Sequence, residues 1–235
     1  MMGKVIMSGI VPPLKAPVSY KANFEDNDWA TIIDACQKNR VPDSWVVGSQ
    51  KAMTINGTDY LIDIIGKNHD DYADGSGKAP LTFQMHDCYV TQYQMNNSGS
   101  HNNWESSKMR TTSLPLIMEL MPTEVQQGLK SIKKLTTVGN SIGTVVTTED
   151  KLFLLSEIEV LCSRSYSMSG EGEPYEYYSA GNSRIKIVPG MGPYYWWVRS
   201  PCYGTSDSYC IFNNAGNDYY YIATFEAGVS FAFCF

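Results

Sequence analysis

The amino-acid sequence predicts an α/β domain of the α+β kind, in which a few helices accompany small antiparallel sheets. Three observations lead to this fold class. Asn56-Gly57 separates two strand-like runs and is the strongest short-range signal for a β-hairpin, because both turn positions favour positive φ. Residues 229–235 alternate with the period of two expected of a strand. In residues 29–36, apolar side chains recur at helical spacing.

The N-terminal segment differs in composition from the rest of the chain. Residues 1–22 contain Pro12, Pro13 and Pro17, so they are predicted to form an extended arm rather than a helix. Such an arm either pairs with a neighbouring subunit, giving a homo-oligomer, or connects the domain to another segment. The start also lacks the continuous apolar run of a signal peptide, and we expect synthesis in the cytoplasm. Residues 23–235 show no break in composition and are interpreted as one domain.

Start and stop signals place the helices. Asp26 or Asn27 is expected to cap the first helix, whose apolar stripe faces the core. Residues 104–132 are predicted to be a second helical region, with helical spacing from residue 113 to 121 and one interruption at Pro122. Thr123 and Gln126 have the spacing of a capping box and are expected to start a further helical piece there.

The strands are predicted from alternation, short apolar runs and the turn residues between them. In the last of them, Val229, Phe231, Phe233 and Phe235 fall on one face, so we expect one side of this strand in the core and the other outside it. The strand-like runs are residues 52–55, 58–65, 81–85, 133–138, 144–148, 151–156, 184–188, 194–198 and 229–235.

Composition excludes some partners. The net charge is −6 and the pI is near 5.1, which argues against nucleic acid or an anionic membrane surface as partner, since phosphate binding needs clustered Lys and Arg. No stretch approaches the length of an apolar membrane helix, so membrane insertion is not expected. The six cysteines form no CxxC pair, and buried free thiols are favoured over a disulfide framework.

No motif for catalysis, cofactor binding or metal ligation is found. The histidines lack metal-ligand spacing, and the signatures of hydrolases, phosphate-binding loops and dinucleotide-binding folds are missing. Glu157 with Glu159, and Glu171 with Glu173, are carboxylate pairs two residues apart. Such pairs lie on one face of a strand or flank a turn, so they are weak indications of a glycosidase. We predict no catalytic residue and no cofactor.

One acidic segment leaves two interpretations open. Asp70, Asp74 and Gly75 resemble the start of a calcium-binding EF-hand loop, but Tyr72 occupies a position that should offer oxygen and no Glu closes the loop. The better-supported interpretation is a turn in which these side chains hydrogen-bond to their own backbone.

Residues 202–226 have the composition of a contact surface. The segment is rich in Tyr, Ser, Asn and Asp and contains no Lys, Arg, His or Pro. Tyr supplies contact area at a low cost in rotamer entropy, and Ser and Asn supply adaptable hydrogen bonds, as in antibody paratopes. The alternative is a hairpin whose tyrosines pack on one another across strands. Both interpretations remain open at this point.

Several motifs resemble a known family. The run WWVRSP at residues 196–201 and the ending GVSFAFCF at residues 228–235 resemble the WWLRSP and GVxxAFC motifs of a domain family abundant in gut Firmicutes and their phages, in cell-surface or tail-associated proteins. Further matches are DIIGKNHD at 63–70, LTFQ at 81–84, WESSKMR at 104–110 and DKLFLLSE at 150–157.

The ending is also similar to the variable region of proteins diversified by retroelements that mutate adenines. This resemblance implies a C-type lectin-like fold related to formylglycine-generating enzymes, with two main helices and small twisted antiparallel sheets. It also implies that exposed side chains vary on a fixed scaffold. The ligand-binding residues implied in this way are Tyr203, Thr205, Ser206, Ser208, Tyr209, Ile211, Asn214, Asp218, Tyr219, Tyr220, Ile222 and Thr224.

The function expected from this resemblance is binding, not catalysis. Residues 23–235 are expected to form a ligand-binding domain that recognises a protein or glycan receptor on a bacterial cell, in a phage tail or at a bacterial surface. Two alternatives are an enzyme on the same scaffold that acts on surface glycans or thiols, and a purely structural virion protein. Exposure of the tyrosines would separate them, because the structural protein would bury these rings at subunit contacts.

Overall fold

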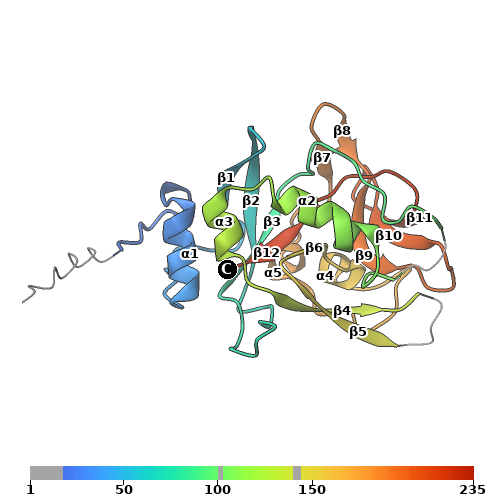
Figure 1. Cartoon of the computed structure of the whole chain (residues 1–235), viewed down its shortest axis with the longest axis horizontal. Helices are drawn as coiled ribbons and strands as arrows, with labels where there is room; N and C mark the ends of the chain where they lie inside the picture. Colours follow the sequence, from blue (N-terminus) through green and yellow to red (C-terminus); the bar gives the residue numbers. More distant parts are fainter. Residues whose placement is uncertain (1–17, 100–102, 140–143) are drawn as a thin grey trace, which may run out of the picture.

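Figure 1 shows the computed structural model of the chain, which describes residues 18–99, 103–139 and 144–235. These residues form an α+β fold with small antiparallel sheets and few helices, so the predicted fold class is confirmed. Most of the predicted arm, residues 1–17, lies outside the described residues. The strands are β1 (Gln50–Ile55), β2 (Thr58–Lys67), β3 (Leu81–Met85), β4 (Ile132–Thr137), β5 (Val145–Asp150), β6 (Leu152–Phe153), β7 (Lys186–Val188), β8 (Gly192–Tyr194), β9 (Trp196–Pro201), β10 (Ser208–Phe212), β11 (Asp218–Ile222) and β12 (Ala232–Cys234).

The strands build one larger sheet and three small ones within the described residues. The five-stranded sheet has the order β1-β2-β3-β12-β6, and a three-stranded sheet has the order β11-β10-β9. Two hairpins, β4-β5 and β7-β8, complete the set. The three-stranded sheet lies at the end of the molecule opposite the first helix (Figure 1).

The helices are short, and the two longest helical stretches are α1 and the continuous run of η2 and α2. The helical segments are η1 (Phe24–Asp26), α1 (Trp29–Gln37), η2 (Met109–Ser113), α2 (Leu114–Met118), α3 (Thr123–Gly128), α4 (Glu157–Leu161) and α5 (Glu176–Ser179).

The first helix is present, but its predicted cap is wrong. Asp28 caps α1, because its side chain accepts a hydrogen bond from the Thr31 N–H at 2.7 Å. Asp26 belongs to the short helix η1, and the Asn27 amide instead donates to backbone carbonyls of the preceding turn. Trp29 is buried, as its place on the apolar stripe predicts.

The hairpin at Asn56-Gly57 is confirmed. Both residues have positive φ, 49° and 77°, and they join β1 to β2 in a regular antiparallel register. Residues 133–138 and 144–148 likewise form a strand pair, observed as β4 and β5.

The C-terminal strand β12 lies inside the main sheet, between β3 and β6 (Figure 1). Phe233 and Phe235 pack against Phe83, with ring centroids 5.4 and 5.3 Å apart. The expectation that only one face of this strand is buried is wrong, since all of residues 229–235 are buried. Ser230, on the more polar face, is accommodated by donating a hydrogen bond to the Met85 carbonyl at 2.8 Å.

Two local predictions are corrected by hydrogen bonding. The buried strand expected at residues 151–156 shortens to β6, because Ser156 caps helix α4 in a capping box with Glu159. The capping box expected at Thr123 does not form: Pro122 precedes α3, and the Gln126 amide donates to the carbonyls of Glu119 and Met121. Helices α4 and α5 were not predicted.

Two composition-based expectations can be checked in the described residues. All six cysteines are free thiols, and they are buried except for Cys162, which is exposed. Among the described helices, none is long and apolar enough to cross a membrane.

Candidate functional site

The three-stranded sheet changes from buried to exposed across its width. Every residue of β9 and of the central strand β10 is buried, whereas β11, at the edge, is exposed or half-buried along its whole length. The end of β10 packs in the core, where the Phe212 ring stacks on the Trp196 ring of β9 with centroids 5.1 Å apart. The sheet therefore anchors one strand in the core and leaves another at the surface.

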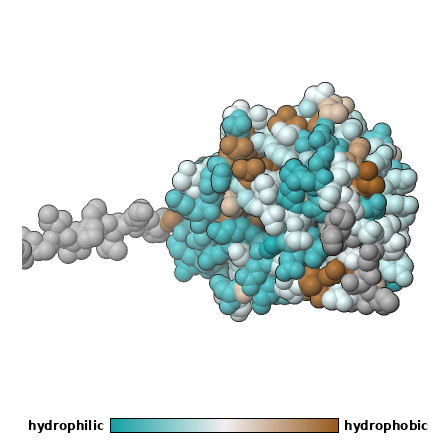
Figure 2. Space-filling view, turned by 45° about the vertical axis from the view of Figure 1, so that its right-hand side comes forward, coloured by the Kyte–Doolittle hydropathy of each residue, from teal (hydrophilic) through white to brown (hydrophobic). Residues whose placement is uncertain are grey.

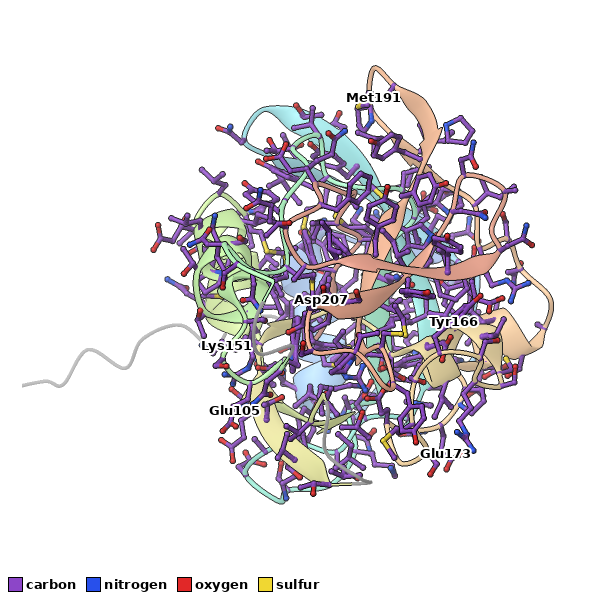
Figure 3. The ribbon with its side chains drawn as sticks, turned by 90° about the vertical axis from the view of Figure 1, so that its right-hand side faces the viewer. Glu105, Lys151, Tyr166, Glu173, Met191 and Asp207 are labelled. Carbon is purple, nitrogen blue, oxygen red and sulfur yellow. The ribbon has the colours of Figure 1, made fainter. Side chains whose placement is uncertain are left out.

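Five large side chains from this region are exposed, and we call them the tyrosine surface. Their exposed fractions are 65% for Tyr203, 45% for Tyr219, 38% for Tyr220, 39% for Tyr221 and 47% for Ile222. Figure 3 looks onto this side of the molecule, with Tyr166 and Asp207 on the same face. In Figure 2, pale residues of intermediate hydropathy dominate the right-hand side and brown is confined to separate patches, as expected of a face rich in Tyr, Ser and Thr.

The exposed rings are supported by neighbouring rings. Tyr219 stacks on Tyr220 at 5.5 Å, and Tyr220 lies 5.0 Å from Tyr166. On the other side, Tyr221 lies 4.2 Å from Phe225. Each aromatic pair contributes about 0.5–1.5 kcal/mol beyond the burial of its area. The rings are therefore held in place while one part of each remains open to solvent.

The structure divides the twelve residues predicted from the sequence. Ser208, Tyr209 and Ile211 are buried, so their assignment as contact residues is wrong: they belong to β10, which is covered on both faces. Tyr221, which the predicted set omits, lies among the exposed rings, and so does the half-buried Tyr166. The predicted residues that the structure leaves exposed or half-buried are Tyr203, Thr205, Ser206, Asn214, Asp218, Tyr219, Tyr220, Ile222 and Thr224.

A buried carboxylate fixes the loop beneath the rings. The Glu157 carboxylate accepts hydrogen bonds from the backbone N–H groups of Tyr166, at 3.0 Å, and Ser167, at 2.8 Å. The Tyr166 carbonyl in turn accepts from the Tyr203 N–H at 2.6 Å. The Glu157 N–H donates to the Ser200 hydroxyl of β9 at 2.8 Å. Helix α4, loop 165–167 and the loop that carries Tyr203 are thus joined by hydrogen bonds.

Arg199 of β9 is the centre of a buried charge network. It is fully buried, and its guanidinium forms a bidentate pair with Glu159 at 2.6 and 3.0 Å. The remaining donors reach backbone carbonyls of Leu135, Leu154 and Glu171. Burial by itself would raise the pKa of Glu159, but the charges of Arg199 and Lys134 outweigh it and hold that pKa below its ordinary value. The arginine of the WWVRSP motif is therefore a structural group.

A second carboxylate in the network is Asp70. It pairs with Lys134 at 2.8 Å and accepts hydrogen bonds from Thr82 at 2.6 Å and Tyr175 at 2.8 Å. Burial opposes ionisation of Asp70, yet Lys134 keeps its pKa below the ordinary value. The oxygens of Asp70 are thus already paired within the protein, which contradicts the calcium interpretation. The Asp74 carboxylate accepts a hydrogen bond from the Ser76 N–H, as the turn interpretation predicts. No cluster of potential metal ligands occurs among the described residues.

Three of the four carboxylates in the pairs of the sequence are also engaged, whereas Glu173 is exposed. Glu157 and Glu159 lie in the first turn of α4 rather than on a strand. Glu171 accepts hydrogen bonds from the Thr137 N–H at 2.8 Å and from the Ser200 hydroxyl. Burial raises the pKa of Glu171 against the effect of these bonds. These carboxylates hold secondary structure together and line no common cleft with an open position for substrate.

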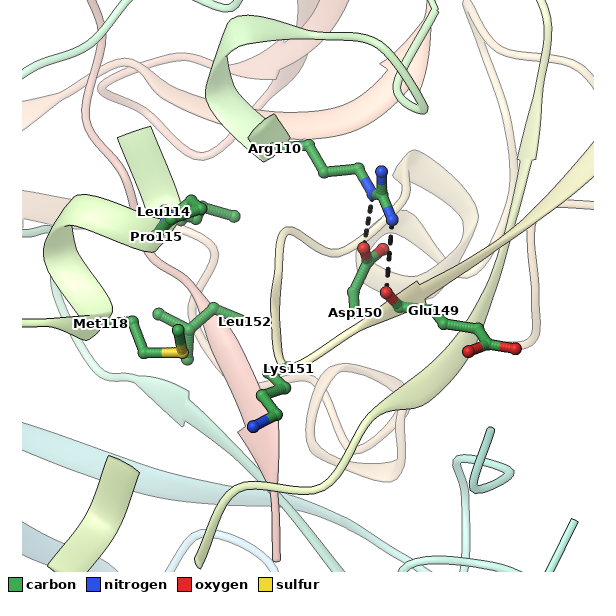
Figure 4. A pocket seen from close by; sticks show the side chains of 8 residues that line it. All are labelled: Arg110, Leu114, Pro115, Met118, Glu149, Asp150, Lys151 and Leu152. Atoms are coloured by element: carbon green, nitrogen blue, oxygen red, sulfur yellow. Dashed lines mark hydrogen bonds and ion pairs between the residues drawn. The ribbon is translucent and has the colours of Figure 1, made fainter. Parts of the chain in front are cut away.

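Two pockets lie away from the tyrosine surface. One, of about 230 Å³, is walled by the apolar side chains of α2 and by the Arg110–Asp150 ion pair (Figure 4). The other, of about 460 Å³, is lined by residues that include His69, Lys133 and Glu173. The His69 ring stacks on Tyr175 at 4.0 Å, and burial lowers the pKa of His69. The larger pocket also contains the carboxylates of Asp70 and Asp71 and the ammonium group of Lys78, and Asp71 pairs with Lys78 at 3.1 Å.

Comparison with known proteins gives one family. Searches of curated proteins and of solved structures return no match. A family described as "Domain of unknown function (DUF6273)" matches residues 81–234. The matched segment runs from β3 to the end of β12 and includes the whole tyrosine surface together with Arg199, Glu159 and Lys134. Since this segment is more than half of the sequence, the chain belongs to the DUF6273 family.

Proposed function

We propose that this protein is a non-enzymatic binding protein that contacts a receptor, a protein or a glycan on a bacterial cell surface, through its tyrosine surface. One observation carries the proposal: Tyr203, Tyr219, Tyr220 and Tyr221 expose their rings beside strands that are otherwise wholly buried. Exposed tyrosines give large contact area with few rotamers to immobilise, and their hydroxyl groups add hydrogen bonds.

The scaffold that we propose is C-type lectin-like and related to formylglycine-generating enzymes, with a ligand-binding domain at residues 23–235 and an attachment arm at residues 1–22. The α+β architecture with small antiparallel sheets is compatible with this relation. In this proposal the protein acts in a phage tail or at the surface of a bacterium. Several copies on one particle would raise a modest affinity through effective concentration.

An enzyme on the same scaffold is less well supported. An active site needs titratable groups that converge on a pocket. In the larger pocket, the carboxylates of Asp70 and Asp71 are paired with Lys134 and Lys78. The buried carboxylates Glu157, Glu159 and Glu171 accept hydrogen bonds from neighbouring backbone, hydroxyl or cationic groups. Burial raises the pKa of the thiols of Cys202 and Cys210, which makes both less reactive as nucleophiles.

Retroelement diversification is part of the proposal and makes a separate prediction. Variation at Ser208, Tyr209 or Ile211 would disturb the core, because these side chains are buried. Sequence variants should therefore concentrate at the exposed and half-buried positions, such as Tyr203, Tyr219 and Ile222. The DNA beside the gene should hold a near-copy of its last hundred or so bases that differs only at adenines, next to a reverse transcriptase.

Binding to cells tests the proposed function directly. Labelled protein would be titrated onto a panel of gut Firmicutes cells and the bound fraction measured by flow cytometry. For a strain that binds, Tyr219→Ala/Tyr221→Ala should weaken binding by roughly 10–100-fold, since central aromatic contacts often contribute 2 kcal/mol or more. Leu116→Ala is the matched control: Leu116 is 52% exposed, but it lies on α2, outside the tyrosine surface.

Two results would reject the proposal. The first is a folded Tyr219→Ala/Tyr221→Ala variant that binds the same cells as tightly as the unaltered protein. The second is a loss of binding that is equal for the Leu116→Ala control. Circular dichroism of each variant, measured before the titration, establishes that the fold is retained.

A further inference from the structure

Strand β11 is an edge strand whose outward backbone groups can be identified from the hydrogen bonds of its neighbours. Asn213 N–H donates to the Asn217 carbonyl at 2.9 Å, and Ala223 N–H donates to the Asp207 carbonyl at 2.7 Å. These two bonds close the β10-β11 ladder at either end. In an antiparallel ladder, hydrogen-bonded pairs alternate with pairs whose backbone groups point away.

The register then assigns each residue of β11. Tyr219 and Tyr221, opposite Ile211 and Tyr209, hydrogen-bond to β10. Asp218, Tyr220 and Ile222 direct their backbone N–H and C=O groups away from the sheet. The Ser208 carbonyl supports this assignment, because it accepts from the Cys202 N–H on the β9 side, and Ser208 is the partner of Ile222.

Tyr220 is at the centre of this open edge. The Ile222 carbonyl accepts a bond from the Phe225 N–H at 2.9 Å, so that group is already used. Within residues 18–99, 103–139 and 144–235, no residue hydrogen-bonds to the backbone N–H or carbonyl of Tyr220. A donor and an acceptor in strand conformation therefore face outward side by side.

In the described residues, β11 lacks three of the features that usually prevent strands from pairing, namely lysine, proline and a bulge. Natural sheets protect their edges with lysines, prolines, bulges or covering segments. β1, an edge of the main sheet, contains Lys51 and is covered by Trp29, whose indole N–H donates to the Ala52 carbonyl at 3.1 Å. β11 has the sequence DYYYI, with no lysine or proline, and pairs with β10 without a register shift.

We propose that β11 pairs antiparallel with β11 of a second copy of this chain, about a twofold axis at Tyr220. In this arrangement Tyr220 faces Tyr220 of the other copy and the two exchange their free N–H and C=O groups. Tyr219 of one copy lies opposite Tyr221 of the other, which gives two aromatic cross-strand pairs. Asp218 lies opposite Ile222. The two three-stranded sheets then form one sheet of six strands.

Charge and symmetry favour a second copy over a foreign strand. The register is self-complementary, as a twofold interface requires. Asp218 is the one charged residue of β11. Pairing centred on Tyr220 separates the two Asp218 residues by four positions along the strand, about 13 Å at about 3.3 Å per residue. That separation exceeds the screening length of about 10 Å at 0.1 M salt, so the carboxylates do not oppose association.

This pairing is independent of the proposed receptor, although it would act on the same surface. Only the backbone edge is buried by strand pairing, because side chains of a strand project from the two faces of the sheet. On one face of the joined sheet, the Tyr219 and Tyr221 rings of the two copies would lie side by side. A dimer would therefore present two equivalent contact areas to a repeated receptor.

A proline at the central position tests the pairing. Tyr220→Pro removes the outward N–H, which β10 does not use, whereas Tyr220→Ala removes the ring and keeps the N–H. Sedimentation velocity over a dilution series should show a concentration-dependent dimer for the unaltered protein and for Tyr220→Ala. For Tyr220→Pro, the dimer dissociation constant should rise at least tenfold. Circular dichroism would verify that all three proteins are folded.

A symmetric disulfide gives a second readout. Facing residues of a hydrogen-bonded antiparallel pair have Cα atoms about 5.5 Å apart, which a disulfide can span. In a Cys162→Ala background, which removes the exposed native thiol, Tyr220→Cys should give a covalent dimer under mild oxidation. Tyr203→Cys is the control, because Tyr203 is more exposed but lies outside β11.

The proposal is overturned if the unaltered protein is monomeric up to about millimolar concentration, the weak end of measurable association. It is also overturned if Tyr220→Pro dimerises like Tyr220→Ala, or if the two cysteine variants cross-link at equal rates. A monomeric protein that adds a foreign peptide to β11 would count among these contradicting results. Cell binding by monomeric Tyr220→Pro as strong as that of dimeric Tyr220→Ala, which lacks the same ring, would show that the receptor proposal stands without the dimer.

Discussion

Strands β10 and β11 are neighbours in one sheet, and both lie in the segment 202–226 that has the composition of a contact surface, yet they have opposite environments. β10 is buried throughout, and its Tyr209 is fully inaccessible, whereas the facing Tyr221 is 39% exposed. The difference comes from position in the sheet. β10 is flanked by strands on both sides and covered on both faces, while β11 has a strand on one side alone. Tyrosine in a strand therefore indicates function only when the position of that strand is known.

The largest expected effect on stability comes from replacing Arg199, which lies in the buried strand β9 next to β10. Arg199→Met leaves Glu159 charged and buried with Lys134 as its remaining cation, which should lower the free energy of unfolding by about 4 kcal/mol. Urea unfolding would measure the loss. Arg164→Met is the control, because Arg164 is exposed.

If Arg199→Met changes the free energy of unfolding by no more than the Arg164 control, the network does not support the sheet as described. Replacing both partners, as Arg199→Met with Glu159→Met, should recover part of the loss, since no uncompensated charge then remains.

A slightly smaller effect is expected at Tyr209, in the buried strand. Tyr209→Ala removes a ring that is fully buried and lies 6.5 Å from Trp197, and it should cost about 3 kcal/mol through the cavity that remains. Differential scanning calorimetry would measure the fall in Tm. Tyr209→Phe keeps the ring and loses only the hydroxyl's hydrogen bonds with Asn96, at 3.4 Å, and with the Asn103 backbone, so it should cost less. Equal losses in the two variants would contradict the packing explanation.

Low pH should destabilise the protein by protonating buried carboxylates, and not through residues of the exposed strand β11. The pKa values of Glu159 and Asp70 are lower in the folded protein than the ordinary values of 4.5 and 3.8. Their contribution to stability is therefore complete above the ordinary values and is lost as the pH falls below them, through the lower pKa values of the folded protein. Glu171, whose pKa is raised, gains a proton earlier and opposes this trend.

The measurement is the free energy of unfolding by urea as a function of pH. We expect a decline below about pH 4.5, the ordinary pKa of Glu. The decline should be reduced in the Arg199→Met/Glu159→Met variant, because one of the two responsible carboxylates is gone. A profile that is flat down to pH 3 would contradict the role assigned to these ion pairs.

The smallest effect on stability is expected at the exposed strand itself. Tyr219→Ala should lower the free energy of unfolding by less than about 1 kcal/mol, since it removes surface ring contacts and creates no cavity. The same change should still weaken receptor binding. A loss of stability as large as that of Tyr209→Ala would mean that β11 belongs to the core.

The sequence was informative where local chemistry decides the structure. The Asn56-Gly57 hairpin and the apolar stripe at Trp29 both rest on spacing and backbone preference, and both are observed. Helix α4 was missed although Ser156 and Glu159 have the spacing of a capping box, because the apolar run before them was interpreted as a continuous strand. The burial of its carboxylates could not be predicted from local spacing, since their partners Arg199 and Tyr166 lie 40 and 9 positions away.

The candidate site was predictable only in part, because its composition is local but the exposure of its residues depends on distant parts of the chain. Composition located the segment, but it could not separate Tyr209 from Tyr219, since their exposure depends on which strand is central. Tyr166 has no signal in the sequence, because it reaches the surface rings through a loop whose position depends on Glu157.

The hydrogen bonds from loop 165–167 to the Glu157 carboxylate should affect the kinetics of binding. Because the backbone around Tyr166 is already ordered in the free protein, little conformational entropy remains to be lost when a partner arrives. Substitutions within the tyrosine surface should then shorten the lifetime of a complex more than they slow its formation. A Glu157→Gln change should do the reverse, because the loosened loop would have to find its shape before each productive encounter.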